Sequence, residues 1–293
     1  MDGVIVVDKP EGWTSHDAVN KVRRLANTRR VGHLGTLDPM ATGVLPLVVN
    51  RATRLAQFFV RGEKIYDGVV QFGYATDTYD RDGSPTTPVT EPAIDREELR
   101  TALESFTGLL QQMPPPISAK KIGGTPAYKL ARKNLPVELK PAEVTVYSIE
   151  LASLDGPLAR LIVRCSAGTY MRSIAHDLGR AIGCGAFVQS LRRMASGDFS
   201  LDQARTIDQL EKLAGEDRLL EALLPAAQLL PAFPSELVDA LTASQIRQGR
   251  DFRVSPFRTR VGTRYVKAVT QEGELVALGE MKLPNVYHPF LVL

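Results

Sequence analysis

The sequence predicts a mixed α+β fold, in which a larger N-terminal domain precedes a small β-rich domain. Strand-like and helix-like segments alternate irregularly, which favours α+β over repeated βαβ units. The length of 293 residues suggests about two domains. Pro231 and Pro234 end a Leu-rich stretch, and two strand-like runs follow around a turn at Glu272-Gly273. We therefore expect domains at residues 1–232 and 233–293.

The elements of the larger domain follow from apolar periodicity and from capping residues. Strands are expected at residues 4–7, 64–72, 144–151 and 158–165, and in the apolar run after Gly43. One helix is expected to be capped by Ser15. A second is opened by the capping box of Asp95 and Glu98, and a third carries Ile174 on its apolar side.

Composition excludes several classes of protein. With 44% hydrophobic and 24% charged residues, the chain is typical of globular proteins. Cys165 and Cys184 are far apart and provide neither a disulfide framework nor a zinc site, and the four histidines lack metal-ligand spacing. No signal peptide and no apolar run of about 18 residues is present. We expect a monomeric, metal-free cytoplasmic protein without a membrane partner.

Positive charge is concentrated in two places although the net charge is only +3. Between Gln112 and Pro141 there are six basic residues and one acidic residue. The second cluster has no acid between its members: Lys21, Arg23, Arg24, Arg29 and Arg30. Such runs are either solvated faces or tracks for phosphates, and position alone leaves both open.

The first basic cluster lies in an irregular segment, residues 112–142, that contains three consecutive prolines and a glycine pair. Only residues 128–133 have a helical pattern. Long irregular insertions in compact proteins are usually functional. The acidic stretch at 77–83 departs from a calcium loop, with Thr78 and Val89 at ligand positions, and is interpreted as a solvated turn.

Common nucleotide and hydrolase motifs are absent from the sequence. It contains no GxxxxGK[ST] and no GxSxG, and Gly183-Cys184-Gly185 follows a helix rather than a strand. The residue that remains is Asp38. Pro39 biases it towards an extended conformation, and a nearby cation such as Arg172 would keep its carboxylate charged in a dry pocket. On its own, Asp38 could instead merely cap the loop by accepting hydrogen bonds from backbone amides.

Four segments, in order, resemble the TruB family of pseudouridine synthases. They are residues 8–10 (DKP) with Gly12, residues 32–45 (GHLGTLDPMATGVL), residues 64–66 (KIY) and residues 165–172 (CSAGTYMR). The resemblance spans nearly the whole chain. It implies an α+β catalytic domain with a mixed sheet and an RNA-clamping insertion at 112–142, followed by a small β-barrel PUA domain that binds RNA.

The resemblance also implies roles for individual residues. Asp38 resembles the nucleophile, Arg172 its ion-pair partner, and Tyr66 the aromatic that stacks on the base and removes the C5 proton. Other positions match residues that shape the pocket or contact RNA: His33, which takes the place of the extruded base, Tyr170, Lys9 and Leu191. From the basic segment we add Lys120, Lys121, Arg132 and Lys133 as RNA contacts.

The implied reaction is the isomerisation of uridine 55 to pseudouridine in the T loop of tRNA. It adds no atom and changes no redox state, so no cofactor is expected. The base must leave its stack, at a cost of a few kcal/mol that stacking and phosphate contacts offset. Whether Asp38 attacks C1′ or C6, or acts through a glycal, stays open. Three alternatives are an RNA chaperone, a guide-RNA-dependent relative and an aspartate phosphotransferase, the last lacking acids for magnesium near Asp38.

Overall fold

One mixed sheet forms the centre of the larger part of the molecule. The computed structural model describes residues 1–117, 121–122, 125–126, 140–256 and 263–293. The strands of this sheet follow one another along the chain as β1 Gly3–Lys9, β2 Val31–His33, β3 Thr42–Val49, β4 Lys64–Phe72, β5 Gly108–Gln112, β8 Ala142–Asp155, β9 Leu158–Cys165, β10 Ala186–Ser196, β11 Phe199–Ser200 and β12 Leu223–Pro225. The order in space is β12-β1-β3-β10-β4-β9-β8-β5, with β2 on β3 and β11 on β10.

The pairing of β3 with β10 makes the sheet mixed. These two strands run parallel, whereas the other neighbours pair antiparallel. In β4, every second residue from Lys64 to Phe72 is buried, which is the period of a strand with one face on the core. The mixed α+β class expected from the sequence is thereby confirmed.

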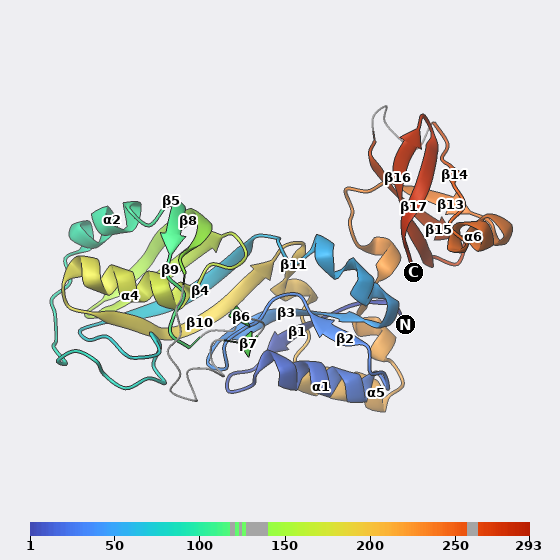
Figure 1. Cartoon of the computed structure of the whole chain (residues 1–293). Helices are drawn as coiled ribbons and strands as arrows, with labels where there is room; N and C mark the ends of the chain where they lie inside the picture. The colour runs from blue at the N-terminus through green and yellow to red at the C-terminus, as the bar shows by residue number, and fades with distance from the viewer. Residues whose placement is uncertain (118–120, 123–124, 127–139, 257–262) are drawn as a thin grey trace.

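Two pairs of helices cover the sheet (Figure 1). Their bounds are α1 Ser15–Leu25, α2 Arg96–Glu104, α4 Met171–Ile182 and α5 Ile207–Gly215. Helices α2 and α4 contact each other over one half of the sheet, and α1 contacts α5 at the other half. Short 3-10 turns complete this part, at η1 Asn50–Phe58, η2 Leu201–Gln203, η3 Leu219–Ala222 and η4 Ala226–Gln228.

The N-terminal cap of α1 differs from the sequence expectation. Thr14, not Ser15, is the cap, because Thr14 and Asp17 form a reciprocal capping box. Ser15 is buried and bonds elsewhere. In α2, Asp95 is the cap as expected and accepts hydrogen bonds from the amides of Glu97 and Glu98, but the described hydrogen bonds do not include the return bond from Glu98 that would complete the expected capping box.

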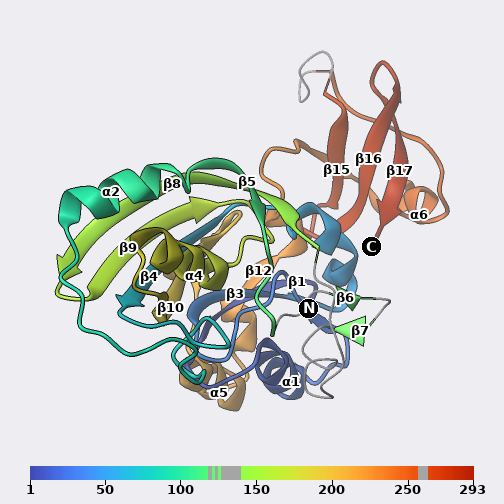
Figure 2. The same ribbon diagram turned by 60° about the vertical axis from the view of Figure 1, so that its left-hand side comes forward.

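A second, five-stranded sheet forms a half-barrel near the C-terminus (Figures 1 and 2). Its elements are β13 Ser235–Val238, α6 Ala240–Arg247, β14 Phe252–Arg253, β15 Tyr265–Thr270, β16 Leu275–Leu283 and β17 Val286–Val292. It rests beside η1, where Arg54 bonds to the carbonyl of Val292 and Arg51 pairs with Glu274. Apolar side chains of both parts, including Leu55 and Leu291, belong to one buried cluster.

The expected insertion is described only at its margins and at a two-stranded hairpin. This hairpin consists of β6 Lys121–Ile122 and β7 Thr125–Pro126. The expected helix at 128–133 lies outside the described residues, as do Lys120, Arg132 and Lys133; of Lys121 only the backbone is described. Within the described ranges, no helix is long and apolar enough to cross a membrane.

Candidate active site

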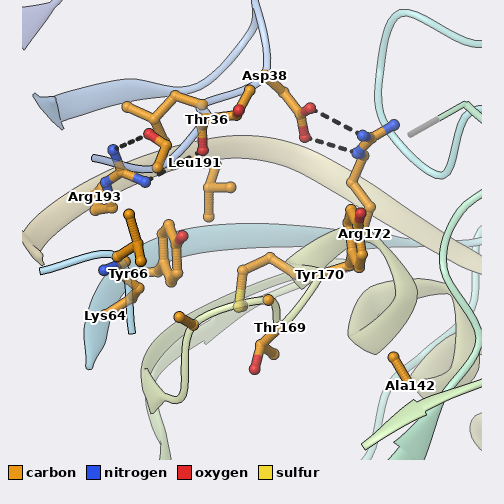
Figure 3. A pocket seen from close by; sticks show the side chains of 16 residues that line it. Thr36, Asp38, Lys64, Tyr66, Ala142, Thr169, Tyr170, Arg172, Leu191 and Arg193 are labelled. Carbon is orange, nitrogen blue, oxygen red and sulfur yellow. Dashed lines mark hydrogen bonds and ion pairs between the residues drawn. The ribbon is translucent and has the colours of Figure 1, made fainter. Parts of the chain in front are cut away.

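A cavity of about 410 Å³ opens where the loop before β3, strands β4 and β10, and the start of α4 meet (Figure 3). Its lining residues are Gly35, Thr36, Leu37, Asp38, Val60, Lys64, Tyr66, Ala142, Ala167, Gly168, Thr169, Tyr170, Met171, Arg172, Leu191 and Arg193. Ligand sites are typically 300–1,000 Å³, so the cavity has the size of a small-molecule site. Asp38, Tyr66, Arg172, Tyr170 and Leu191, all expected at the site, are among these residues.

The loop that carries Asp38 is held by buried hydrogen bonds on both sides of it. The Ser15 hydroxyl accepts from the Leu37 amide (2.8 Å) and donates to the Leu37 carbonyl (3.1 Å). The Lys9 ammonium donates to the carbonyls of Pro10, Trp13 and Pro39. Because these anchors come from α1 and β1, the carboxylate projects from a fixed backbone.

Asp38 and Arg172 form an ion pair across the cavity rim (Figure 3). The distance from Arg172 Nε to Asp38 Oδ2 is 2.8 Å, and Nη2 donates to Oδ1 at 2.9 Å. Arg172 is 5% exposed and Asp38 33%, so the cation is buried while the carboxylate reaches the cavity. Because the cation is buried, solvent screens the attraction within this pair less than it screens a pair on the surface. The pairing expected between these two residues is present.

A second carboxylate, that of Asp80, lies close to Arg172. It belongs to the acidic stretch 77–83, which is interpreted from the sequence as a solvated turn. That interpretation is wrong for Asp80, which is 6% exposed and lies 3.4 Å from Arg172 Nη1 through Oδ2. Burial raises its pKa, opposed by a hydrogen bond from Thr78 and by the charge of Arg172. The burial arises because residues 78–80 pack against β10, where the Tyr79 carbonyl accepts from the Val188 amide.

Part of the cavity wall is aromatic and aliphatic. Tyr66 and Leu191 lie on neighbouring strands, at 8% and 7% exposure, and Tyr170 precedes α4. Burial raises the pKa of the Tyr66 phenol, while the charge of Arg193 and a side-chain hydrogen bond from it act in the opposite direction. This arrangement provides flat surfaces on which an unstacked base can lie.

Two cations in the cavity wall received no site role from the sequence: Lys64, which appears there only as part of the KIY segment, and Arg193. Arg193 donates to the carbonyls of Val44 (2.7 Å), Thr36 (3.3 Å) and Gly35 (3.1 Å). Strand parity is the signal that could have found them. Lys64 shares the inward parity of Tyr66 in β4, and Arg193 shares that of Leu191 in β10.

Two other expected residues lie away from the cavity lining. Lys9 has no exposed surface and contacts the Pro39 carbonyl, so its influence on the pocket passes through the Asp38 loop. Burial lowers its pKa to about 8. His33, at the end of β2, is partly buried and accepts a hydrogen bond from the Gly35 amide at 3.4 Å. Burial also lowers the pKa of His33.

The second basic cluster is partly used for structure rather than left free for phosphates. Lys21 pairs with Glu211 of α5, and Arg23 donates to the Val31 carbonyl.

Across the described ranges, no group of three or more His, Cys, Asp or Glu side chains is arranged to hold a metal ion. The site therefore consists of one cavity, an Asp-Arg-Asp chain and buried cations.

Comparison with known proteins identifies the family. A sequence model described as TruB family pseudouridylate synthase (N terminal domain) matches residues 23–171. A second, described as tRNA pseudouridylate synthase B C-terminal domain, matches residues 172–231. The chain belongs to the TruB family of pseudouridylate synthases. It is therefore an isomerase that makes pseudouridine, as the resemblance of the Asp38 motif implied.

Relatives and solved structures agree with this membership. The chain is 64% identical to tRNA pseudouridine synthase B of Solibacter usitatus (strain Ellin6076), over all of both chains. It is 37% identical to the protein of that name from Aquifex aeolicus (strain VF5), over 96% of each. The fold also matches a structure of an H/ACA RNP bound to a substrate RNA containing 2'-deoxyuridine, with a TM-score of 0.67 and 26% identity over 95% of this chain and 77% of that one.

Proposed function

We propose that this TruB family member isomerises uridine 55 to pseudouridine in the T loop of tRNA, with Asp38 as the nucleophile and with no cofactor. The observation that carries the proposal is the ion pair of Asp38 with buried Arg172 at the rim of an aromatic-walled cavity. The relatives with full-length similarity are tRNA pseudouridine synthases B, which supports tRNA as the substrate.

The reaction detaches the base at N1, turns it and joins C5 to the sugar. In the proposal the uridine is flipped into the cavity, where the Tyr66 ring stacks on it and Leu191 and Tyr170 bound it. Arg172 keeps the Asp38 carboxylate aimed at the cavity. The Tyr66 oxygen then takes the C5 proton while its own hydroxyl proton passes to an acceptor, and N1 of the product ends with a proton. Since burial raises the pKa of this phenol, its hydroxyl is protonated at neutral pH, and the transfer requires a proton acceptor coupled to that hydroxyl.

We further propose that tRNA is held by parts of the chain outside the cavity. The basic residues Lys120, Lys121, Arg132 and Lys133 would contact backbone phosphates, and His33 would fill the space of the flipped base. Residues 233–293 would act as a PUA-like RNA-binding domain after a catalytic domain at 1–232. The structure of the H/ACA RNP, which the fold of this chain matches, contains its protein within an RNA–protein assembly. We favour standalone action because of the basic insertion.

The proposal is tested by mapping pseudouridine in tRNA incubated with the purified protein alone. We expect one modified position, uridine 55, and no modification in a transcript with cytidine at that position. The same yield is expected in excess EDTA. Modification elsewhere, or only with an added guide RNA, would contradict the assignment. Improved tRNA folding without pseudouridine would favour a chaperone.

A further inference from the structure

Lys64 and Arg193 are buried cations without a carboxylate partner among the described residues. They are 4% and 1% exposed, respectively. The ion pairs at the cavity within the described ranges join Arg172 to Asp38 and Asp80, and neither Lys64 nor Arg193 takes part in them. Buried charges in proteins are normally paired, so this pair of cations requires an explanation.

The groups that face Lys64 do not neutralise it. They are Arg193 on β10, Cys165 opposite it on β9, and Tyr66 two residues along its own strand. Burial raises the pKa of the Cys165 thiol to about 11, so the sulfur carries no charge at neutral pH. The ammonium donates one hydrogen bond among the described residues, to the Gly62 carbonyl at 2.8 Å, although it has three donors.

The two cations converge on one side of the cavity (Figure 3). A Cβ added at Gly35 would lie 3.7 Å from Arg193 Nη1 and 3.8 Å from Lys64 Cε, so both side chains approach the same point. Tyr66 lies beside them, and the pair of Asp38 with Arg172 lies at the other side. A base stacked on Tyr66 would thus have Asp38 on one side and the cations on the other.

We propose that Lys64 and Arg193 form an anion-binding corner that contacts the carbonyl oxygens of the uracil ring and stabilises the negative charge that the ring carries during the reaction. The inference rests on the proposed function, because it assumes a uridine in this cavity. It assigns a role in catalysis to two residues that lie outside the Asp-Arg-Asp chain.

The ring becomes anionic in each route left open by the sequence. If Asp38 attacks C1′, the N1–C1′ bond breaks and its electron pair stays on the ring, spread over N1, O2 and O4. If a glycal forms, C2′ loses a proton and the same electron pair stays on the ring. If Asp38 adds to C6, the C5–C6 π electrons move to C5 and O4. In the first route C5 then displaces the Asp38 carboxylate from C1′, and in the second C2′ regains its proton as C5 bonds to C1′. In the third the N1–C1′ bond breaks, C5 bonds to C1′, and loss of the C5 proton restores the C5–C6 double bond and expels the Asp38 carboxylate. In every route the C5 proton leaves and N1 ends with a proton.

Depth favours the base over a phosphate as the bound anion. Both cations lie in the wall beside the stacking ring, whereas phosphates remain on the outer backbone of a flipped nucleotide. The two sources differ in what they control. A contact to the ring anion changes the chemical step, whereas a contact to a phosphate changes binding and its salt dependence.

The protonation of Lys64 provides a readout that a structural role would not move. Burial, assisted by the charge of Arg193, lowers the pKa of Lys64 to about 8. Because the protonated Lys64 is the active form in this proposal, the rate of the chemical step should fall about tenfold per pH unit above about pH 8. The pKa of Lys9 is also lowered to about 8, so the pH profile of a Lys64 variant is needed to show which of the two lysines causes the decline.

The test measures single-turnover rates and tRNA affinity for Lys64→Met and Lys64→Arg from pH 6 to 10. We expect Lys64→Met to slow the chemical step about 100-fold with Kd changed less than about threefold, the scale of a lost oxyanion-hole donor. Lys64→Arg should recover to within about tenfold of the wild type and lose the decline above pH 8. Arg193 is left in place because its three carbonyl contacts hold the Asp38 loop.

A control for the substitution itself comes from Lys212, which is exposed on α5, outside the cavity lining and outside the segments proposed to contact tRNA. Lys212→Met should leave the single-turnover rate unchanged. A wild-type rate in Lys64→Met, a loss of affinity alone, or a decline above pH 8 that persists in Lys64→Arg would each overturn the inference. If Lys64→Met fails to fold, the pH profile of Lys64→Arg decides. A wild-type protein inactive on tRNA would instead refute the proposed function.

Discussion

Arg172 lies between Asp38 and Asp80, and its guanidinium contacts both carboxylates, at 2.8 Å and 3.4 Å. The Arg172 side chain also donates from Nη1 to the Thr78 carbonyl at 3.1 Å. A cation held on two sides has little freedom to rotate. The orientation of the Asp38 carboxylate therefore depends on Thr78 and Asp80, which do not line the cavity.

The first prediction concerns Asp80→Asn. Losing this carboxylate frees one side of Arg172, so the chemical step should slow by about 10- to 100-fold, the equivalent of one charged hydrogen bond. Single-turnover kinetics measure this rate, and tRNA affinity should stay the same. Asp82→Asn is the control, because Asp82 is exposed two residues along the same loop. Equal rates in the two variants would show that Asp80 does not position Arg172.

The second prediction concerns Ser15→Ala. Its hydroxyl makes both bonds to Leu37, so its removal should lower the free energy of unfolding by about 1–3 kcal/mol and also slow the chemical step. Thr14→Ala is the control. It removes the cap of the same helix, at about 1 kcal/mol, without touching the Asp38 loop. Denaturant unfolding and single-turnover rates should separate the two, and a rate loss in Thr14→Ala of the same size would count against the loop contact.

The third prediction concerns the basic segment. Replacing Lys120, Lys121, Arg132 and Lys133 with Ala should weaken tRNA binding and reduce the slope of log affinity against log salt by up to about 3. Filter binding across a range of salt concentrations provides the measurement. A slope equal to that of the wild type would mean that these side chains do not contact phosphates.

The fourth prediction links the Lys64 pKa to stability. In the folded chain the pKa is about 8, below the unfolded value of 10.5, so between these values the unfolded chain binds the extra proton. The free energy of unfolding should therefore rise with pH in this window, by on the order of 2 kcal/mol relative to Lys64→Met. Below pH 8 the difference should be constant. If the free energies of unfolding of the wild type and of Lys64→Met change in parallel from pH 7 to 10.5, burial does not lower the pKa of Lys64.

The sequence predicted the features that depend on local pattern or on a motif. Strand β4 has the expected bounds because its buried residues alternate without interruption. The pairing of Asp38 with Arg172, 134 positions apart, followed from the motifs rather than from periodicity. Asp80 was missed because its burial comes from packing against β10, which no local pattern encodes. Thr14 was missed as a cap because the capping box with Asp17 decides between two adjacent hydroxyls.

The central claim is that the carboxylate of Asp38 performs the reaction, and Asp38→Asn tests it most directly. The amide has nearly the same shape but no negative charge, so tRNA should still bind while nucleophilic attack fails. Release of tritium from tRNA labelled at uridine C5 reports on each turnover. The account predicts no release above background from Asp38→Asn with tRNA affinity largely unchanged, and release at the wild-type rate would contradict it.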